Sequence, residues 1–327
     1  MNIAVHCFYE DRNAWQACHQ ETKGNKDLSR FLEGFEDLQT VIDCIKQAGY
    51  EVHVHEINSK GIEIFKELEG QKNVMVWNLT DGTNIYKGSH IPAIADLYHF
   101  PHIGSNSFVQ MLAQDKDRMR RMVDSHGVKV PAWANIRTSS YQQFHMSFKG
   151  PYFIKPTHFD NGIGENIVYP ICASEHDIQA ALKKYHEYGI EYALVDELLQ
   201  GKEYTVALIN TGEWKAQCFA IGHNEHPYWD WVSKDAANYA LTLEESSVSE
   251  ALIKETIMIA DKLGINDYFR VDYRCDNNST PRFLEINTNP FLICKAYTYM
   301  SQTLFSSRSD MLKQMINASY RRQLRPI

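Results

Sequence analysis

Strand and helix patterns alternate along the first hundred residues, and this alternation limits the fold more than any other feature of the chain. Three short apolar runs, "NIAVHCF", "EVHVHEI" and "NVMVWNL", have the composition of strands. Segments with helical spacing come between and after them, at residues 28–48, 61–69 and 91–100. A β-α-β-α-β order of this kind predicts a small parallel sheet flanked by helices.

Such a sheet often binds a dinucleotide, but the glycine fingerprint of that fold is missing here. The first strand is followed by "YEDRNAWQACHQETKGN", which contains no G-x-G-x-x-G. We therefore exclude a dinucleotide-binding fold.

The composition limits the compartment and the partners. A chain of 327 residues is long enough for two or three domains, and its net charge of −8 argues against a nucleic-acid partner. The seven cysteines include no C-x-x-C pair, which favours reduced thiols over a zinc site. The N-terminus has no basic leader, and no apolar stretch approaches the roughly 20 residues of a membrane span. A cytoplasmic protein without membrane contact is expected.

Two polar strand patterns near the C-terminus predict a hairpin. In "DYFRVDYR", Arg270 and Asp272 point to one face, and in "RFLEIN" Glu285 shares a face with Asn287. The intervening "CDNNSTP" is rich in turn-forming residues. An antiparallel pairing across it would set Asp272 opposite Glu285 and Arg270 opposite Asn287, although the seven-residue loop leaves the register open.

Two carboxylates facing each other in such a pairing would lie about 5 Å apart at their Cβ atoms and would repel. A divalent cation removes this repulsion, and carboxylate and amide oxygens suit Mg²⁺ better than zinc. The alternative is a solvent-facing sheet surface with ordinary salt bridges.

Two further segments predict contacts with a nucleotide. In "YFIKPTHFDNGIGENIVYP", a strand ends in Lys155 and a glycine-bearing loop follows, an arrangement that can grip polyphosphate; the alternative is an ordinary hairpin turn. In "YALVDELLQGKEYTVALI", an apolar strand meets Asp196 and Glu197, and Glu203 follows a glycine. An adenine and a ribose could be held there, or the segment could be two strands with surface acids.

In this order the features resemble the ATP-grasp ligases, most closely the D-alanine–D-alanine ligase branch. The resemblance rests on "QDKDRMRRMV", "FIKPTHFDNGIG", "LVDELLQGKEYTVALI", "YFRVDYR" and "FLEINTNP", and it covers nearly the whole chain. It implies an α/β ATP-grasp fold with a pre-ATP-grasp parallel domain at 1–110, a central subdomain with a lid loop at 111–200, and a C-terminal subdomain with the magnesium site at 201–327. It also implies ATP, Mg²⁺ or Mn²⁺, and a homodimer.

The resemblance also implies roles for single residues. The nucleotide-binding set would be Lys116, Lys155, Lys234, Asp196, Glu197, Leu198 and Glu203. Its lysines would contact the phosphates, Asp196 would lie near the adenine amino group, and Glu203 would bind the ribose. Backbone groups around residues 197 and 198 would read the base. The metal ligands would be Asp272, Glu285 and Asn287, and the catalytic residues would be Arg270, Lys234 and the lid residue Asn161.

The implied activity is a ligation of two small molecules, a carboxylate and an amine. The carboxylate would be phosphorylated by ATP, and the amine would then displace phosphate from the acyl phosphate to form an amide. Arg270 would stabilise the oxyanion of the tetrahedral intermediate, and the lid would exclude water.

The substrate side departs from the family. "NLTDGTNIYKG" lacks the family's His-Gly pair, and Asn161 and Gly162 replace two lid serines. Phe291 stands where the family has a glycine beside the second amino acid. D-Ala-D-Ala synthesis is therefore not expected.

Three alternatives stay open. The "DNGIG" lid is similar to that of ligases of secondary metabolism that form an imine on a vinylogous acid. The other two are a kinase that stops at the phosphorylated product and an ATP-binding protein without ligase turnover.

Overall fold

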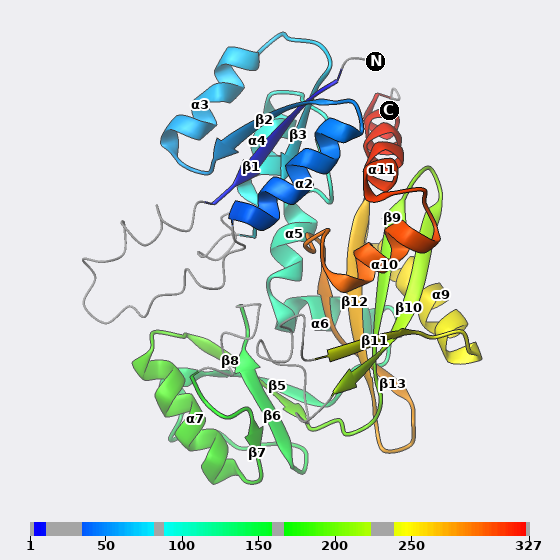
Figure 1. Ribbon diagram of the computed structural model, residues 1–327. Helices are drawn as coiled ribbons and strands as arrows, with labels where there is room; N and C mark the ends of the chain where they lie inside the picture. The colour runs from blue at the N-terminus through cyan, green and yellow to red at the C-terminus, as the bar shows by residue number, and fades with distance from the viewer. Residues whose placement is uncertain (1–2, 11–34, 82–87, 159–166, 224–238, 325–327) are drawn as a thin grey trace.

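A computed structural model describes residues 3–10, 35–81, 88–158, 167–223 and 239–324 of the chain. The N-terminal part is a parallel sheet with strand order β2-β1-β3-β4. Its strands are β1 (Ala4–Tyr9), β2 (Glu51–Glu56), β3 (Val74–Asn78) and β4 (His102–Ile103). The predicted parallel sheet is confirmed (Figure 1). The short strand β4 extends it at one edge.

The helices of this part begin and end close to the positions that the sequence indicates. They are α2 (Phe35–Gln47), α3 (Ser59–Leu68) and α4 (His90–Leu97). Residues 28–34 of the first predicted helix lie outside the described residues. Helix α2 stops because Gly49 adopts a left-handed φ of 93°, which a glycine reaches without steric cost.

Helices α5 (Ser107–Ala113) and α6 (Lys116–Ser125) lead to a second sheet, with order β5-β8-β6-β7 and antiparallel pairings. Its strands are β5 (Trp133–Arg137), β6 (Tyr152–Pro156), β7 (Ile171–Cys172) and β8 (Tyr192–Glu197), and a short helix η2 (Thr138–Ser140) follows β5. Helix α7 (Glu175–Glu187) covers one face of this sheet (Figure 1). Ser174 caps α7 as predicted, in a capping box with Asp177.

A third sheet follows, with order β11-β10-β9-β12-β13 and antiparallel pairings. Its strands are β9 (Glu203–Asn210), β10 (Trp214–His223), β11 (Tyr239–Leu243), β12 (Tyr268–Cys275) and β13 (Pro281–Asn287). Its helices are α9 (Ser247–Leu263), α10 (Lys295–Thr303) and α11 (Arg308–Gln323).

The start of α9 corrects one expectation. The spacing of Ser247 and Glu250 predicts a capping box with Ser247 as the N-cap, but the N-cap is Ser246, and its side chain makes no capping hydrogen bond. The predicted end is correct, because Gly264 closes the helix in a left-handed conformation with φ of 69°.

The first and third sheets share one hydrophobic core. Trp77 of β3 and Tyr268 of β12 are both buried in it, together with residues of α10 and α11. A buried carboxylate adds a polar tie: Asp267 accepts hydrogen bonds from the Gly104 N–H and from the side chains of Ser319 and Arg322. These bonds tie the end of β4 and helix α11 to the start of β12. Within the described ranges no helix is long and apolar enough to cross a membrane.

Candidate active site

The β12–β13 hairpin forms with the register that the sequence predicts. Asp272 pairs with Glu285, and Arg270 pairs with Asn287. The ladder shifts by a bulge between Asp272 and Tyr273, so the two strands stay in the predicted register only on the side of the polar residues. The hairpin therefore brings the three predicted metal ligands and Arg270 together.

Asp272 lies at the centre of this polar face. Its Oδ1 accepts a hydrogen bond from the Thr205 hydroxyl at 2.6 Å, and Arg270 donates to both carboxylate oxygens at 3.1 Å. Thr205 pairs with Asp272 across β9 and β12, so its side chain points to the same face. Sequence reasoning missed Thr205, although its alternation with Glu203 along β9 could have placed it there.

The charges of this face affect one another's ionisation. Burial raises the pKa of the Asp272 carboxyl, and the nearby Glu285 raises it further, while Arg270 and the Thr205 hydroxyl oppose the shift. Burial disfavours the charged form of Arg270, but the Asp272 carboxylate outweighs it and holds the pKa of the guanidinium above its usual value. Asp272 and Glu285 thus repel each other as the sequence suggests.

A lysine from the second sheet reaches this hairpin. The Nζ of Lys155, at the end of β6, lies 3.8 Å from Glu285 Oε2 and 3.8 Å from Asp196 Oδ2. Asp196 belongs to β8, the neighbour of β6 in the second sheet. Lys155 therefore bridges acids of two different sheets, and these sheets come together at its amine.

Arg120 on α6 is a residue of this region that sequence reasoning missed. Its guanidinium is fully buried and donates to both Asp196 oxygens, at 3.1 Å for Nη2, and to the Leu284 carbonyl at 3.1 Å. It also lies over the Trp133 ring, 5.6 Å from its centroid. The spacing along the helix could have indicated its position, because Arg120 follows Lys116 by one helical turn and shares its face of the helix.

The other predicted lysine, Lys116, opens α6 and is buried. Its backbone N–H donates to the carbonyl of Thr157 just beyond β6, which joins the start of α6 to the root of the predicted lid. Asp115 caps the helix through the Arg118 N–H, and its other oxygen lies 3.2 Å from the His158 ring. Burial disfavours the Asp115 carboxylate, but the bonds from His158 and Arg118 outweigh it and lower its pKa.

Several groups of the predicted nucleotide-binding connector already have partners. The Glu197 N–H donates to the Ala132 carbonyl, and the Leu198 N–H donates to the Pro151 carbonyl. Glu203 is buried, 3.5 Å from Arg274. The expected role of Asp196 beside an adenine stays a prediction, and in this structure its carboxylate is paired with Arg120.

Two predicted catalytic residues, Asn161 and Lys234, lie outside the described residues, and so do the glycines of the predicted lid. Phe291 is described, and its partly buried ring packs against the core shared by the first and third sheets. It lines a crevice of about 10 Å³ together with Leu38, Leu79 and Tyr268. That volume is at the lower limit for a single water molecule.

Other polar side chains of the third and N-terminal sheets also have structural partners. The Tyr297 hydroxyl donates to the Phe269 carbonyl at 2.8 Å, with the Leu208 carbonyl 3.3 Å away, and Arg282 donates to Asp276 in the hairpin loop. No group of three or more His, Cys, Asp or Glu side chains that could hold a metal is found in the described part of the chain. In the N-terminal sheet, His53 of β2 stacks on His6 of β1, and His55 lies within hydrogen-bond distance of His6.

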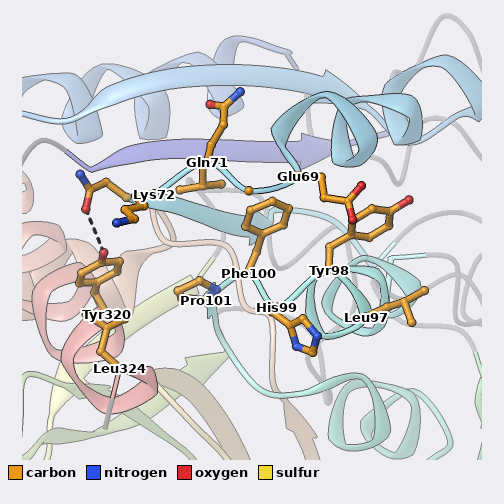
Figure 2. A pocket seen from close by; sticks show the side chains of 13 residues that line it. Glu69, Gln71, Lys72, Leu97, Tyr98, His99, Phe100, Pro101, Tyr320 and Leu324 are labelled. Carbon is orange, nitrogen blue, oxygen red and sulfur yellow. Dashed lines mark hydrogen bonds between the residues drawn. The ribbon is translucent and has the colours of Figure 1, made fainter. Parts of the chain in front are cut away.

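A cavity of about 820 Å³ lies at the amino ends of β3 and β4, at the opposite edge of the N-terminal sheet (Figure 2). It is lined by two loops and the end of α11, including Lys72, Tyr98, His99 and Tyr320. In α/β sheets, ligands bind at the carboxyl ends of the strands. This cavity at the amino ends is therefore not the candidate active site.

The donor set of the hairpin fits a hard divalent cation. Asp272 and Glu285 supply carboxylate oxygens and Asn287 supplies an amide oxygen, all on adjacent strands. Burial and, less strongly, the neighbouring Glu285 raise the pKa of Asp272, and a bound cation would favour the ionised carboxylate against both effects.

A parallel sheet followed by two antiparallel sheets, with a lysine of one reaching the acids of the other, defines an ATP-grasp fold. The chain belongs to the D-alanine–D-alanine ligase family, because the family described as D-ala D-ala ligase C-terminus matches residues 121–317.

Comparisons with individual proteins agree with this assignment. The chain is 28% identical to the uncharacterized protein y4sG of Sinorhizobium fredii over 258 residues, which cover 76% of this chain and 75% of that protein. It is also 28% identical to a D-alanine–D-alanine ligase of Saccharophagus degradans, over 61% of this chain and 62% of that one. Its fold matches the Bacillus anthracis D-alanine–D-alanine ligase complexed with ATP, with a TM-score of 0.71, 15% identity, and coverage of 99% and 98% of the two chains.

Proposed function

We propose that this protein is an ATP-dependent carboxylate–amine ligase that works through an acyl phosphate and does not make D-Ala-D-Ala. The observation that carries the proposal is the convergence of Lys155 with the hairpin acids. Its amine lies 3.8 Å from Glu285, and Glu285 pairs with Asp272, which Arg270 holds. The Lys155 ammonium, the two carboxylates and the Arg270 guanidinium lie where the second and third sheets meet, and this set of charges suits phosphoryl transfer.

ATP would bind between the second and third sheets. The Bacillus anthracis ligase with this fold is complexed with ATP, which supports the same nucleotide here. Lys155 and Lys116 would contact the phosphates, with Lys234 as a further contact, and Glu203 would bind the ribose. Because the N–H groups of Glu197 and Leu198 already have partners, a base at this point would be held by carbonyl oxygens.

Magnesium would be held by Asp272, Glu285 and Asn287. When bound, it would neutralise phosphate charge and draw the two acids into one site. The chain's own contribution is to keep these ligands on rigid paired strands, with Thr205 and Arg270 fixing the Asp272 carboxylate.

The reaction would proceed in two displacements. A substrate carboxylate oxygen attacks the γ-phosphorus of ATP, the bond to ADP breaks, and an acyl phosphate forms. An amine nitrogen then attacks the acyl carbon, phosphate leaves with the bonding electron pair, and the nitrogen loses a proton. Arg270 would stabilise the oxyanion of the tetrahedral intermediate, which forms when the amine attacks and breaks down when phosphate leaves.

The acceptor would differ from D-alanine because of Phe291. Its ring lines a crevice of only about 10 Å³ between the N-terminal part and the loop that follows Asn287 (residues 288–292, here called the metal loop). A second amino acid that needs the space of a glycine at this position would clash. The first substrate also remains open, because the family's His-Gly pair is absent.

A phosphate-release screen of pairs of carboxylates and amines, with products identified by mass spectrometry, tests the proposal. A ligase releases phosphate only when both substrates are present. Release of ADP with a stable phosphorylated acid and no dependence on amine would favour a kinase, and a product that borohydride reduces would favour an imine. Nucleotide binding without any substrate-dependent turnover would leave only an ATP-binding protein. Substantial phosphate release with D-alanine alone at about millimolar concentration, within the usual KM range, would refute the acceptor assignment.

A further inference from the structure

A chain of buried hydrogen bonds leads from the N-terminal sheet to the metal loop. The indole Nε1 of Trp77 donates to the Tyr268 hydroxyl at 3.0 Å, and that hydroxyl donates to Asn289 Oδ1 at 2.6 Å. Both aromatic side chains are almost fully buried, at 0% and 1% exposure. Their rings meet edge to face, 6.0 Å apart.

The chemistry of the donors gives this series of hydrogen bonds one direction. An indole N–H can only donate, so the Tyr268 oxygen must accept from Trp77 and has its own proton to give to Asn289. Asn289 must then present its carbonyl oxygen to Tyr268, and its amide nitrogen points to Asp81 at 3.4 Å. The orientation of the Asn289 side chain is therefore set by the tyrosine.

The next bond reaches a metal ligand. The backbone N–H of Asn289 donates to Asn287 Oδ1 at 2.9 Å, which turns that oxygen in a fixed direction. We infer that Tyr268 is a positioning residue, which holds Asn289, and through it the Asn287 carboxamide, in the orientation that binds the metal. This inference rests on the proposed function, because it requires Asn287 to be a ligand.

The chain of bonds also joins two parts of the site. Trp77 and Asp81 lie at and beyond the carboxyl end of β3, where α/β sheets bind ligands, and Asn287 ends β13 in the third sheet. The metal loop is thus held from the side of the N-terminal sheet. Groups that orient a metal ligand usually change metal affinity when they are removed, even without touching the metal.

The test measures metal binding directly, in the full chain with a non-hydrolysable ATP analogue. Mn²⁺ is titrated into the complex, and the free ion is followed by electron paramagnetic resonance. Tyr268→Phe removes only the hydroxyl, and we expect it to weaken Mn²⁺ binding by about tenfold. The matched control is Tyr320→Phe, because Tyr320 is also buried and its hydroxyl also donates to an asparagine Oδ1, that of Asn73, but at the far edge of the sheet (Figure 2). The control should bind Mn²⁺ like the wild type.

A second variant, Asn289→Ala, tests the same series of hydrogen bonds if Tyr268→Phe does not fold. Asn289→Ala removes the side chain that Tyr268 holds but retains the N–H to Asn287, and it should weaken Mn²⁺ binding to a similar extent. The double variant should be no weaker than either single one, since both changes break the same path. Additive losses, or equal affinity in wild type, Tyr268→Phe and Asn289→Ala, would overturn the inference while leaving the proposed function intact. A wild type that does not bind Mn²⁺ with the nucleotide would overturn both.

Discussion

The buried Arg120–Asp196 pair gives the sharpest prediction about stability. Replacing Arg120 by methionine keeps most of the apolar stem but removes the bonds to both Asp196 oxygens and to the Leu284 carbonyl. The Asp196 carboxylate would remain buried, with Lys155 at 3.8 Å as its remaining cation. Breaking a buried pair from one side typically costs about 3–5 kcal/mol. Because Lys155 stays, we expect a loss near the lower end, about 3 kcal/mol, which is roughly a hundredfold in the folding equilibrium.

The assay is urea unfolding followed by tryptophan fluorescence and circular dichroism. Arg137→Met is the matched control, because Arg137 forms a salt bridge with Glu191 at 2.9 Å in which both side chains are largely exposed. That control should shift the unfolding midpoint little. A second variant, Arg120→Met with Asp196→Leu, should recover part of the loss because it also removes the buried carboxylate, and Lys155 keeps Glu285 as its partner. The reasoning is refuted if Arg120→Met is as stable as Arg137→Met.

Three further predictions concern the site and the N-terminal sheet. Glu285→Ala or Asp272→Ala should abolish substrate-dependent phosphate release and leave the circular dichroism spectrum nearly unchanged; retained activity would contradict the metal assignment. Phe291→Gly should admit small amino acids as acceptors, measured as new D-alanine-dependent phosphate release, and no gain with a folded variant would count against Phe291 as the barrier. Burial, then His53 and His55, lower the pKa of His6 to about 4 from 6.5. Since the unfolded chain takes up this proton first, the unfolding free energy should fall as the pH drops from about 6.5 to 4, and His6→Gln should flatten that slope in urea titrations at several pH values.

The first part of the fold could be predicted from local patterns. Strand alternation and helical spacing located β1, α2, β2, α3, β3 and α4, and the left-handed glycines ended helices where expected. The predicted N-cap of α9 was wrong by one residue. Two adjacent serines compete for the cap, and the spacing to Glu250 favours Ser247, whereas the backbone uses Ser246.

The hairpin could also be predicted, because its register depends on interactions close in sequence. A two-residue period and a turn-rich loop predicted Asp272 opposite Glu285 while the loop length left the register open, and the structure confirms that pairing. The bulge after Asp272 could not be predicted in the same way. It depends on how the strand packs against its neighbours on both sides.

The sequence by itself therefore determined the elements, the parallel sheet and the polar hairpin, because periodicity and turn chemistry act over short distances. Only the tertiary structure decided which polar groups meet: Arg120 with Asp196, Lys155 with Glu285, and Trp77 with Tyr268. These partners are far apart in the chain and lie on different sheets or helices. Their pairing depends on how whole elements pack, and no repeat of two or 3.6 residues encodes that packing.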